Sequence, residues 1–159
     1  MASSNFQKVI DFHNAFDQPT PSIMQKDISI QDRILCDFRL SLIEEEFNEL
    51  KDAIKTNNFT EIRDAIADIL YVVYGTAVSF GINADKDFNI VHESNMSKLC
   101  DNEADAIATI EDYKRKIAEG SCQYNDPIYI YREDIKKYIV KDGKTGKVLK
   151  NIKYNKVNF

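Results

Sequence analysis

Two long segments with helical periodicity, residues 30–55 and 61–80, constrain the fold of this chain more than any other feature. In the first segment, apolar residues recur every three or four positions, as on one face of an α-helix. The second segment is apolar on nearly every side, which is typical of a helix that is buried on most of its surface. Because only the short stretch "TNNFT" joins them, we expect two antiparallel helices packed side by side.

Three further helices are expected, near residues 6–16, 85–99 and 103–119. Asn58 or Thr60 can cap the start of the helix at 61–80, and Gly81 and Gly120 suit left-handed positions after helix ends. After Gly120 the composition changes. "DPIYIY" and "KKYIV" are rich in β-branched and aromatic residues, "KDGKTGK" suggests a tight turn, and "KVLKNI" suggests a returning strand.

The predicted fold class is therefore all-α: an antiparallel bundle of about five helices with a small C-terminal β-hairpin. We expect one domain over residues 1–159, with a helical bundle at 1–120 and a hairpin extension at 121–159. The chain length of 159 residues suits a single core.

The charge of the chain is unevenly distributed. The net charge is −5, but residues 132–159 carry nine Lys or Arg against three Asp or Glu. The acidic body argues against binding to polymeric nucleic acid, and the basic end could serve an anionic substrate, a partner or solubility. Three cysteines without paired spacing indicate a reducing compartment. With no signal peptide and no apolar run long enough to cross a membrane, we expect a cytoplasmic protein.

The stretch "SLIEEEFNEL" places four carboxylates within ten residues of the helix at 30–55. Successive helix residues are rotated by about 100°, so these acids divide into two groups. Glu44 lies on the solvent face, Glu46 and Glu49 fall within the apolar stripe, and Glu45 lies at its edge. Ionised carboxylates on a buried face need compensation. Either a divalent cation binds them, or the helix is loosely buried and they pair with Arg39 or with lysines.

The next helix carries a matching acidic stripe. Asp64 and Asp68 are four residues apart and share one face with Tyr71. Glu61 lies on the same stripe near the helix start, where the helix dipole alone favours an acid. Two antiparallel helices would bring both stripes together as a box of carboxylates. Oxygen ligands without His or Cys suit Mg²⁺, or Mn²⁺, and Mg²⁺ commonly takes substrate phosphates as further ligands.

The motif Glu45-Glu46-Phe47-Asn48-Glu49 resembles the Glu-Glu-x-x-Glu motif of the all-α nucleoside triphosphate pyrophosphohydrolases, the MazG-like superfamily. The stretches "FHNAF", "RDAIADILYVVYGTAVSFGI" and "ESNMSKL" are similar to its phosphoribosyl-ATP pyrophosphohydrolase-like branch. The resemblance implies that Glu45, Glu46, Glu49 and Asp68 bind metal. The second motif of the superfamily is Glu-x-x-Asp, but Ala65 stands where its Glu is expected. Asp64 is the candidate replacement.

The resemblance also implies that Asn95 and Lys98 bind substrate phosphates, since a Lys near such a box can neutralise phosphate charge. Both residues also fit a helix end. His13, Phe16 and Tyr71 are candidates for contact with the base or sugar, although all three fit a core role equally well.

We therefore expect a Mg²⁺-dependent enzyme that cleaves a nucleoside triphosphate, including a deoxynucleotide, between its α- and β-phosphates. Glu46 or Glu49 is the candidate proton acceptor. The resemblance implies a homodimer or homotetramer. The alternatives are hydrolysis of phosphoribosyl-ATP and a non-catalytic helical bundle that binds nucleotide or protein.

Overall fold

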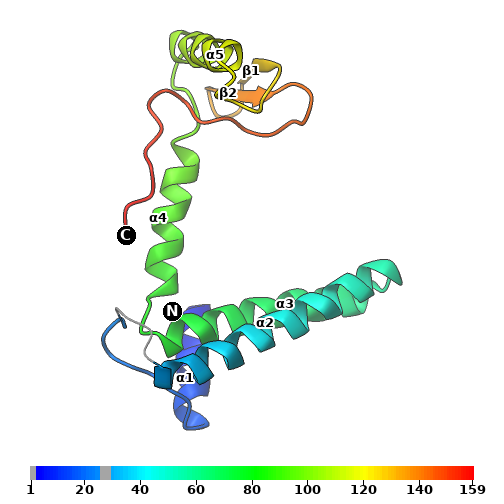
Figure 1. The fold of residues 1–159 in the computed structure, drawn as a ribbon, viewed down its shortest axis with the longest axis vertical. Coiled ribbons are helices and arrows are strands. Elements are labelled where there is room, and N and C mark those ends of the chain that lie inside the picture. The colour runs from blue at the N-terminus through cyan, green and yellow to red at the C-terminus, as the bar shows by residue number, and fades with distance from the viewer. Residues whose placement is uncertain (1–2, 26–29) are drawn as a thin grey trace. The chain divides into compact units, whose positions relative to one another are not determined.

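The computed structural model of the protein describes residues 3–25 and 30–159, except for the side chains of residues 30 and 31. It divides into two compact units, Met1–Lys86 and Asp87–Phe159. The secondary-structure elements, in chain order, are α1 (Asn5–Ala15), α2 (Ile30–Lys55), α3 (Phe59–Ser79), α4 (Ala84–Met96), α5 (Glu103–Ala118), β1 (Pro127–Arg132) and β2 (Lys137–Asp142) (Figure 1).

The first unit is built on α2 and α3, which run side by side in opposite directions, with α1 packed on α3 (Figure 1). Side chains cap the starts of two of these helices. Ser4 accepts a hydrogen bond from the backbone N–H of Gln7 at 3.2 Å, and Asn58 accepts one from the N–H of Glu61 at 3.4 Å. Each cap satisfies a backbone donor that a helix start leaves without a partner.

The end of α3 requires glycine. Gly81 has φ +66°, and a Cβ atom there would lie 2.6 Å from the carbonyl oxygen of Ile23. Its N–H donates to the carbonyl of Val78, and the N–H of Ile82 donates to that of Ala77. These bonds satisfy carbonyls at the end of the helix.

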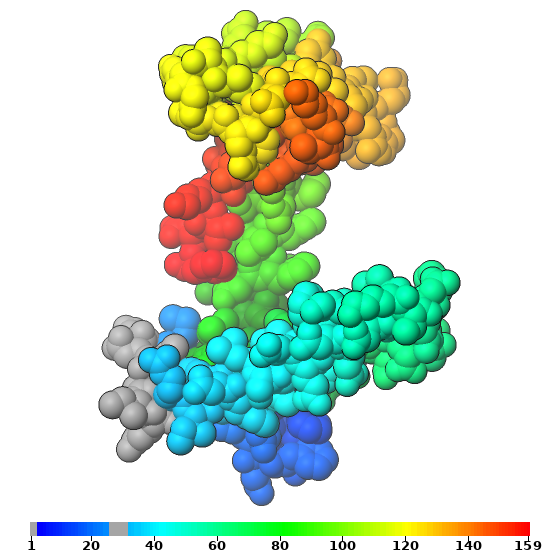
Figure 2. Space-filling view, turned by 45° about the vertical axis from the view of Figure 1, so that its right-hand side comes forward, coloured from blue at the N-terminus to red at the C-terminus, as the bar shows by residue number. Residues whose placement is uncertain are grey.

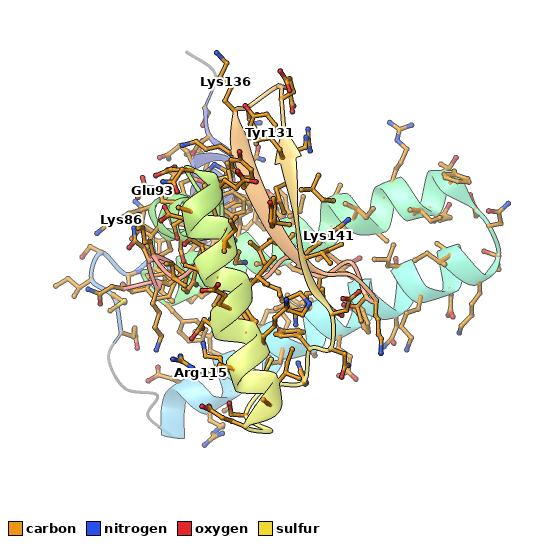
Figure 3. The ribbon with its side chains drawn as sticks, turned by 90° about the horizontal axis from the view of Figure 1, so that it is seen from above. Lys86, Glu93, Arg115, Tyr131, Lys136 and Lys141 are labelled. Carbon is orange, nitrogen blue, oxygen red and sulfur yellow. The ribbon has the colours of Figure 1, made fainter. Side chains whose placement is uncertain are left out.

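The second unit packs α5 against the antiparallel hairpin of β1 and β2. Tyr129 pairs with Val140 in the register of the two strands. Figure 3 shows Tyr131 and Lys136 towards the turn of the hairpin and Lys141 further along β2. The core of this unit consists of Cys100, Ala106, Tyr113, Val140 and Leu149.

A buried carboxylate organises the loops at the far end of the hairpin. Asp142 is 1% exposed. One of its oxygens accepts hydrogen bonds from the N–H groups of Asn125 and Asp126, and the other from the N–H and hydroxyl of Thr145. These hydrogen bonds favour the charged carboxylate, so the pKa of Asp142 is lowered, chiefly by Thr145.

The predicted all-α fold with a C-terminal hairpin is confirmed, including the bounds of α2. Two details were wrong. "KVLKNI" is not a strand: Val148 forms one isolated bridge with Lys141, and the hairpin turn lies between β1 and β2 instead. α3 is not buried on most sides, because Ile66 is 46% and Leu70 52% exposed. The reason is that, among the described elements of the first unit, α1 and α2 alone pack on α3.

The boundary between the two compact units falls within α4, whereas the sequence suggested a division after Gly120. The fourth helix also ends at Met96, three residues before its expected end. No single helix in the described residues combines the length and the apolar character needed to cross a membrane.

Replacing Gly81 by alanine should destabilise the protein more than the same change at Gly120. Gly120 has φ +69° but nothing lies within 4 Å of its would-be Cβ. Gly120→Ala should therefore cost only the left-handed conformation, about 1 kcal/mol. Gly81→Ala adds a clash with backbone, about 1–3 kcal/mol more. Urea denaturation followed by far-UV circular dichroism measures both, and equal losses would contradict the proposed steric role of Ile23.

Candidate active site

The sequence-predicted acids come from the middle of α2 and the first half of α3. Glu45, Glu46 and Glu49 project from α2, and Asp64 and Asp68 from α3. Glu46 is half-buried, while the other four carboxylates are exposed. Four of the five acids are therefore open to solvent, and they do not form the enclosed box that the apolar flanks of Asp68 suggested.

Glu46 lies at the electrostatic centre of this group. Partial burial raises the pKa of its carboxyl above the usual value, and so do the negative charges of Asp68, Glu49, Glu45 and Asp64, in decreasing order. Burial and like charges both disfavour the ionised form of a carboxyl. The effect shows that the two acidic stripes approach one another, as expected from helical phase. We call these five residues the carboxylate cluster.

A hollow of about 660 Å³ adjoins the cluster. Glu45 and Glu49 line it from α2, together with Asn48 and Asp52, and Glu61 lines it from α3. Glu61 was the acid whose role the sequence left open, because a helix start favours an acid by itself. Glu61 and Asp52 are thus two further carboxylates in the hollow beside the cluster.

The chemistry of the cluster suits a hard divalent cation. It offers oxygen atoms only, and none of its five members forms an ion pair with any Lys or Arg in the described part of the chain. Repulsion among these charges is therefore uncompensated by protein groups. In the conformation described for residues 3–25 and 30–159, no three His, Cys, Asp or Glu side chains form a ready metal site. Binding a cation would require their side chains to rotate.

Ala65, which stands where the superfamily motif has glutamate, is 2% exposed. A longer, charged side chain at this buried position would have to displace its neighbours. Asp64, the adjacent residue, is exposed and close enough to raise the pKa of Glu46. This placement agrees with Asp64 as the replacement, and its role as a ligand stays a prediction.

His13 is fully enclosed, at 1% exposure, in a polar core that the sequence did not reveal. Its Nδ1 lies 2.9 Å from the carbonyl oxygen of Pro19, so it must carry the proton and donate. Its Nε2 then accepts a bond from Arg39 at 3.5 Å. A Cβ on Gly75 would lie 3.3 Å from Nε2 and 3.2 Å from Nη1 of Arg39. In the described chain His13 thus organises the core, and its contact with substrate stays a prediction.

Arg39 is itself 6% exposed, and its Nε has no hydrogen-bond partner in the described residues. It does not pair with the glutamates, as one reading of the sequence proposed. Arg39 lies seven residues before Glu46, which is about two helical turns. Burial lowers its pKa.

Phe16 and Tyr71 belong to an exposed aromatic cluster. The ring of Phe12 lies 4.5 Å from that of Phe16 and 5.6 Å, edge-on, from that of Tyr71. All three are at least 40% exposed. Tyr71 follows Asp68 by three residues, so these two side chains share one face of α3. Phe12 was missed in the sequence, although its spacing of four residues from Phe16 indicated a shared face.

Asn95 and Lys98 belong to the second unit. Asn95 is exposed near the end of α4, and Lys98 is half-buried in the following turn. The ammonium of Lys98 donates to Oδ1 of Asn95 at 2.6 Å. The two predicted phosphate ligands are thus brought together.

The all-α nucleotide pyrophosphohydrolase class is defined by an antiparallel helix pair in which the acids of a Glu-Glu-x-x-Glu motif on one helix approach an Asp on the next. The sequence profile of the phosphoribosyl-ATP pyrophosphohydrolase family matches residues 9–95. The chain therefore belongs to this family. It is also 28% identical to an uncharacterised protein of Acanthamoeba polyphaga mimivirus, with 99% of this chain and 94% of that protein covered.

The stability of the protein should depend on the protonation of His13. Burial, and then the charge of Arg39, lower its pKa, against an opposing effect of the bond to Pro19. Near and below pH 6.5 the unfolded chain therefore binds a proton at His13 more readily than the folded chain does. The free energy of unfolding consequently falls as the pH drops through about 6.5. The slope should approach, at most, about 1.4 kcal/mol per pH unit.

Urea denaturation between pH 7.5 and 5 measures this slope. His13→Gln should reduce it, whereas His92→Gln, which removes the exposed second histidine, should leave it unchanged. An identical slope in wild type and His13→Gln would show that His13 is not the group responsible.

Proposed function

We propose that the protein is a Mg²⁺-dependent nucleotide pyrophosphohydrolase that cleaves a nucleoside triphosphate between its α- and β-phosphates. Membership of the family supports hydrolysis of a nucleotide pyrophosphate bond. The observation that carries the finer proposal is that four other carboxylates, none of them compensated by an ion pair in the described residues, act on Glu46. Such a cluster repels a bare phosphate chain, so a phosphate substrate needs a bridging cation.

In this proposal Glu45, Glu46, Glu49, Asp64 and Asp68 hold Mg²⁺. The bound cation supplies neutralisation of phosphoryl charge and lowers the pKa of a water molecule. Glu46 or Glu49 accepts the proton of the attacking water. Water adds to phosphorus, pyrophosphate leaves, and a nucleoside monophosphate remains.

The family resemblance supports Lys98 and Asn95 as ligands of a pyrophosphate group, through the ammonium of the one and the amide of the other. Phe12, Phe16 and Tyr71 offer ring faces on which a base can stack. Stacking favours no particular base, so the same site is compatible with ribo- and deoxynucleotides. A cytoplasmic location would supply both Mg²⁺ and nucleotides.

The family description also supports phosphoribosyl-ATP as the substrate. That molecule carries the same triphosphate-derived pyrophosphate bond, and the carboxylate cluster serves either substrate. From a different class, a helical bundle that binds nucleotide without cleaving it would use the aromatic rings alone.

Purified protein with Mg²⁺ should release pyrophosphate from one or more members of a panel of nucleoside triphosphates, deoxynucleoside triphosphates and phosphoribosyl-ATP. Glu46→Gln should lower kcat by about 100-fold or more, because it removes both a cation ligand and the candidate base. Glu44→Gln, on the solvent face of α2, is the matched control and should retain activity.

Removal of the metal provides a second readout that does not depend on the substrate. Mg²⁺ should raise the melting temperature of wild type and Glu44→Gln, and raise it less in Glu46→Gln, because binding to the folded state stabilises it. Pyrophosphate release that is unaffected by chelation would exclude the metal-dependent mechanism. A wild type inactive on every member of the panel would exclude the enzyme.

We further propose that α2 and α3 pair with the same helices of a second copy of the chain. Large apolar side chains are exposed along both helices: Phe47 is 53% and Ile54 59% exposed on α2, and Ile66 is 46% and Val73 45% exposed on α3. Figure 2 shows α2 and the α2–α3 turn without cover from another element of the first unit. An apolar helix face needs a packing partner.

The spacing of these residues supports helix–helix packing. On α2, the positions Cys36, Leu40, Ile43, Phe47, Leu50 and Ile54 alternate steps of four and three residues, which is the repeat that packs helices along a shared seam. A two-fold axis lets one such face cover its own copy, and two helices from each chain then form a four-helix bundle. The assembly would be a homodimer, or a tetramer of two such dimers.

Phe47→Lys should convert the assembly to monomers, because it places a charge in the apolar seam. Ser41→Lys introduces the same side chain at an exposed position of α2 on a different face and should leave the assembly intact. Sedimentation velocity at micromolar concentration measures the mass of each variant. A wild-type monomer, or a Phe47→Lys dimer as tight as wild type, would contradict the proposed interface.

A further inference from the structure

The residues on either side of Lys98 are hydrogen-bonded to a segment more than fifty residues later in the chain. The N–H of Asn155 donates to Oγ of Ser97 at 3.0 Å, and the side-chain amide of Asn151 donates to the carbonyl of Leu99 at 2.7 Å. We call residues 151–158 the C-terminal strap. All of these residues lie within the second unit.

A further contact joins the strap to the last turn of α4. Ser94 is only 5% exposed. Its hydroxyl donates a hydrogen bond to the carbonyl of Asn155 at 2.7 Å and shares a second hydrogen bond with the Tyr154 hydroxyl at 2.9 Å. Ser97 in turn donates to the carbonyl of Ser94 at 2.7 Å. The hydrogen bonds therefore run without a break from the strap through Ser94 to Ser97.

The strap is itself fixed to the core of the second unit. The N–H of Ile152 donates to the buried Thr109 hydroxyl at 3.2 Å, and the ammonium of Lys153 pairs with Asp105 at 2.7 Å. The ammonium of Lys150 lies 4.7 Å from the centre of the Tyr154 ring. Two lysines of the basic end thus have structural roles, and the segment is more than a solvated tail.

Lys98 differs from the lysines around it in what it binds. Lys137 pairs with Asp101, and Lys153 with Asp105. The ammonium of Lys98 has only the neutral amide oxygen of Asn95 as a partner in the part of the chain that the structure describes. Its positive charge is consequently not neutralised and is available to an anion.

We propose that the C-terminal strap is a positioning element for Lys98, which holds its turn in the conformation that binds a diphosphate group. The proposal rests on the proposed function, in which Lys98 contacts the pyrophosphate end of the substrate. A flexible lysine loses side-chain freedom when it binds an anion. Fixing the backbone before and after it reduces the disorder that binding must remove. Ser97, Asn151 and Asn155 are then positioning residues outside the matched family segment 9–95.

The test measures the binding of inorganic pyrophosphate with Mg²⁺ to the full chain by isothermal titration calorimetry. Lys98→Ala should weaken binding about tenfold or more, since it removes a charge-assisted bond. Asn151→Ala and Ser97→Ala should each weaken it about three- to tenfold, the amount expected for one lost hydrogen bond. Ser97→Thr, which keeps the hydroxyl, should bind like wild type.

A double-mutant cycle separates positioning from a general loss of structure. If Asn151 acts through Lys98, Asn151→Ala should have no further effect in the Lys98→Ala background. Lys144→Ala is the matched control for charge, because it removes a lysine from the turn after β2, and it should bind like wild type. Melting temperatures of all variants confirm that each is folded, and Ser97→Ala replaces Asn151→Ala if the latter is not.

Three results would overturn the proposal: wild-type affinity in Asn151→Ala and Ser97→Ala, full additivity with Lys98→Ala, or no pyrophosphate binding by wild type. The hydrolysis assay remains a separate measurement. Pyrophosphate binding that depends on Lys98 and the strap, in a protein that hydrolyses nothing, would overturn the enzyme and retain the strap. Conversely, if the protein hydrolyses nucleotides but the effects of Asn151→Ala and Lys98→Ala on pyrophosphate binding are additive, the enzyme is retained and the positioning role of the strap is overturned.

Discussion

Repulsion among the carboxylates that α2 and α3 bring together is the constraint around which the first unit is organised. α2 and α3 pack closely enough for the charges of Asp64 and Asp68 to raise the pKa of Glu46. No Lys or Arg in the described residues forms an ion pair with these acids. The energetic cost of the cluster is intelligible if an external cation offsets it.

The helices and the acidic stripes could be predicted from the sequence because both depend on local periodicity. The phase of the helix alone assigned Glu44 to the solvent face and Glu46 to the apolar stripe. The half-buried state of Glu46 agrees with this assignment. What failed depends on tertiary packing. Apolar residues on every side of α3 predict that the helix is buried, but its actual exposure depends on how many other helices pack against it. Likewise, "KVLKNI" has strand composition, yet its backbone is held by the N–H of Asp142, which donates to the carbonyl of Lys147, and by the Tyr113 hydroxyl of α5, which accepts from the N–H of Lys150.

His13 illustrates a different limit. A histidine on an apolar stripe fits a substrate contact and a core residue equally well from sequence. The choice between them required the position of Pro19, six residues away in a loop, and of Arg39 on another helix. Gly75 carried no signal in the sequence either. Its missing side chain makes room for both polar groups.

The two units contain different acid-sensitive groups, and this has a consequence for how the protein would respond to falling pH. His13 favours the neutral form, so its protonation begins to lower stability near pH 6.5, whereas Asp142 favours the charged form, so its contribution is complete above the usual pKa of an aspartate, about 4, and is lost only below it. Between about pH 6.5 and 4, acidification therefore acts on His13 in the first unit and leaves the contribution of Asp142 in the second unit in place. A moderate drop in pH would thus weaken the contacts of His13 with Pro19 and Arg39 before it weakens the loops that Asp142 holds.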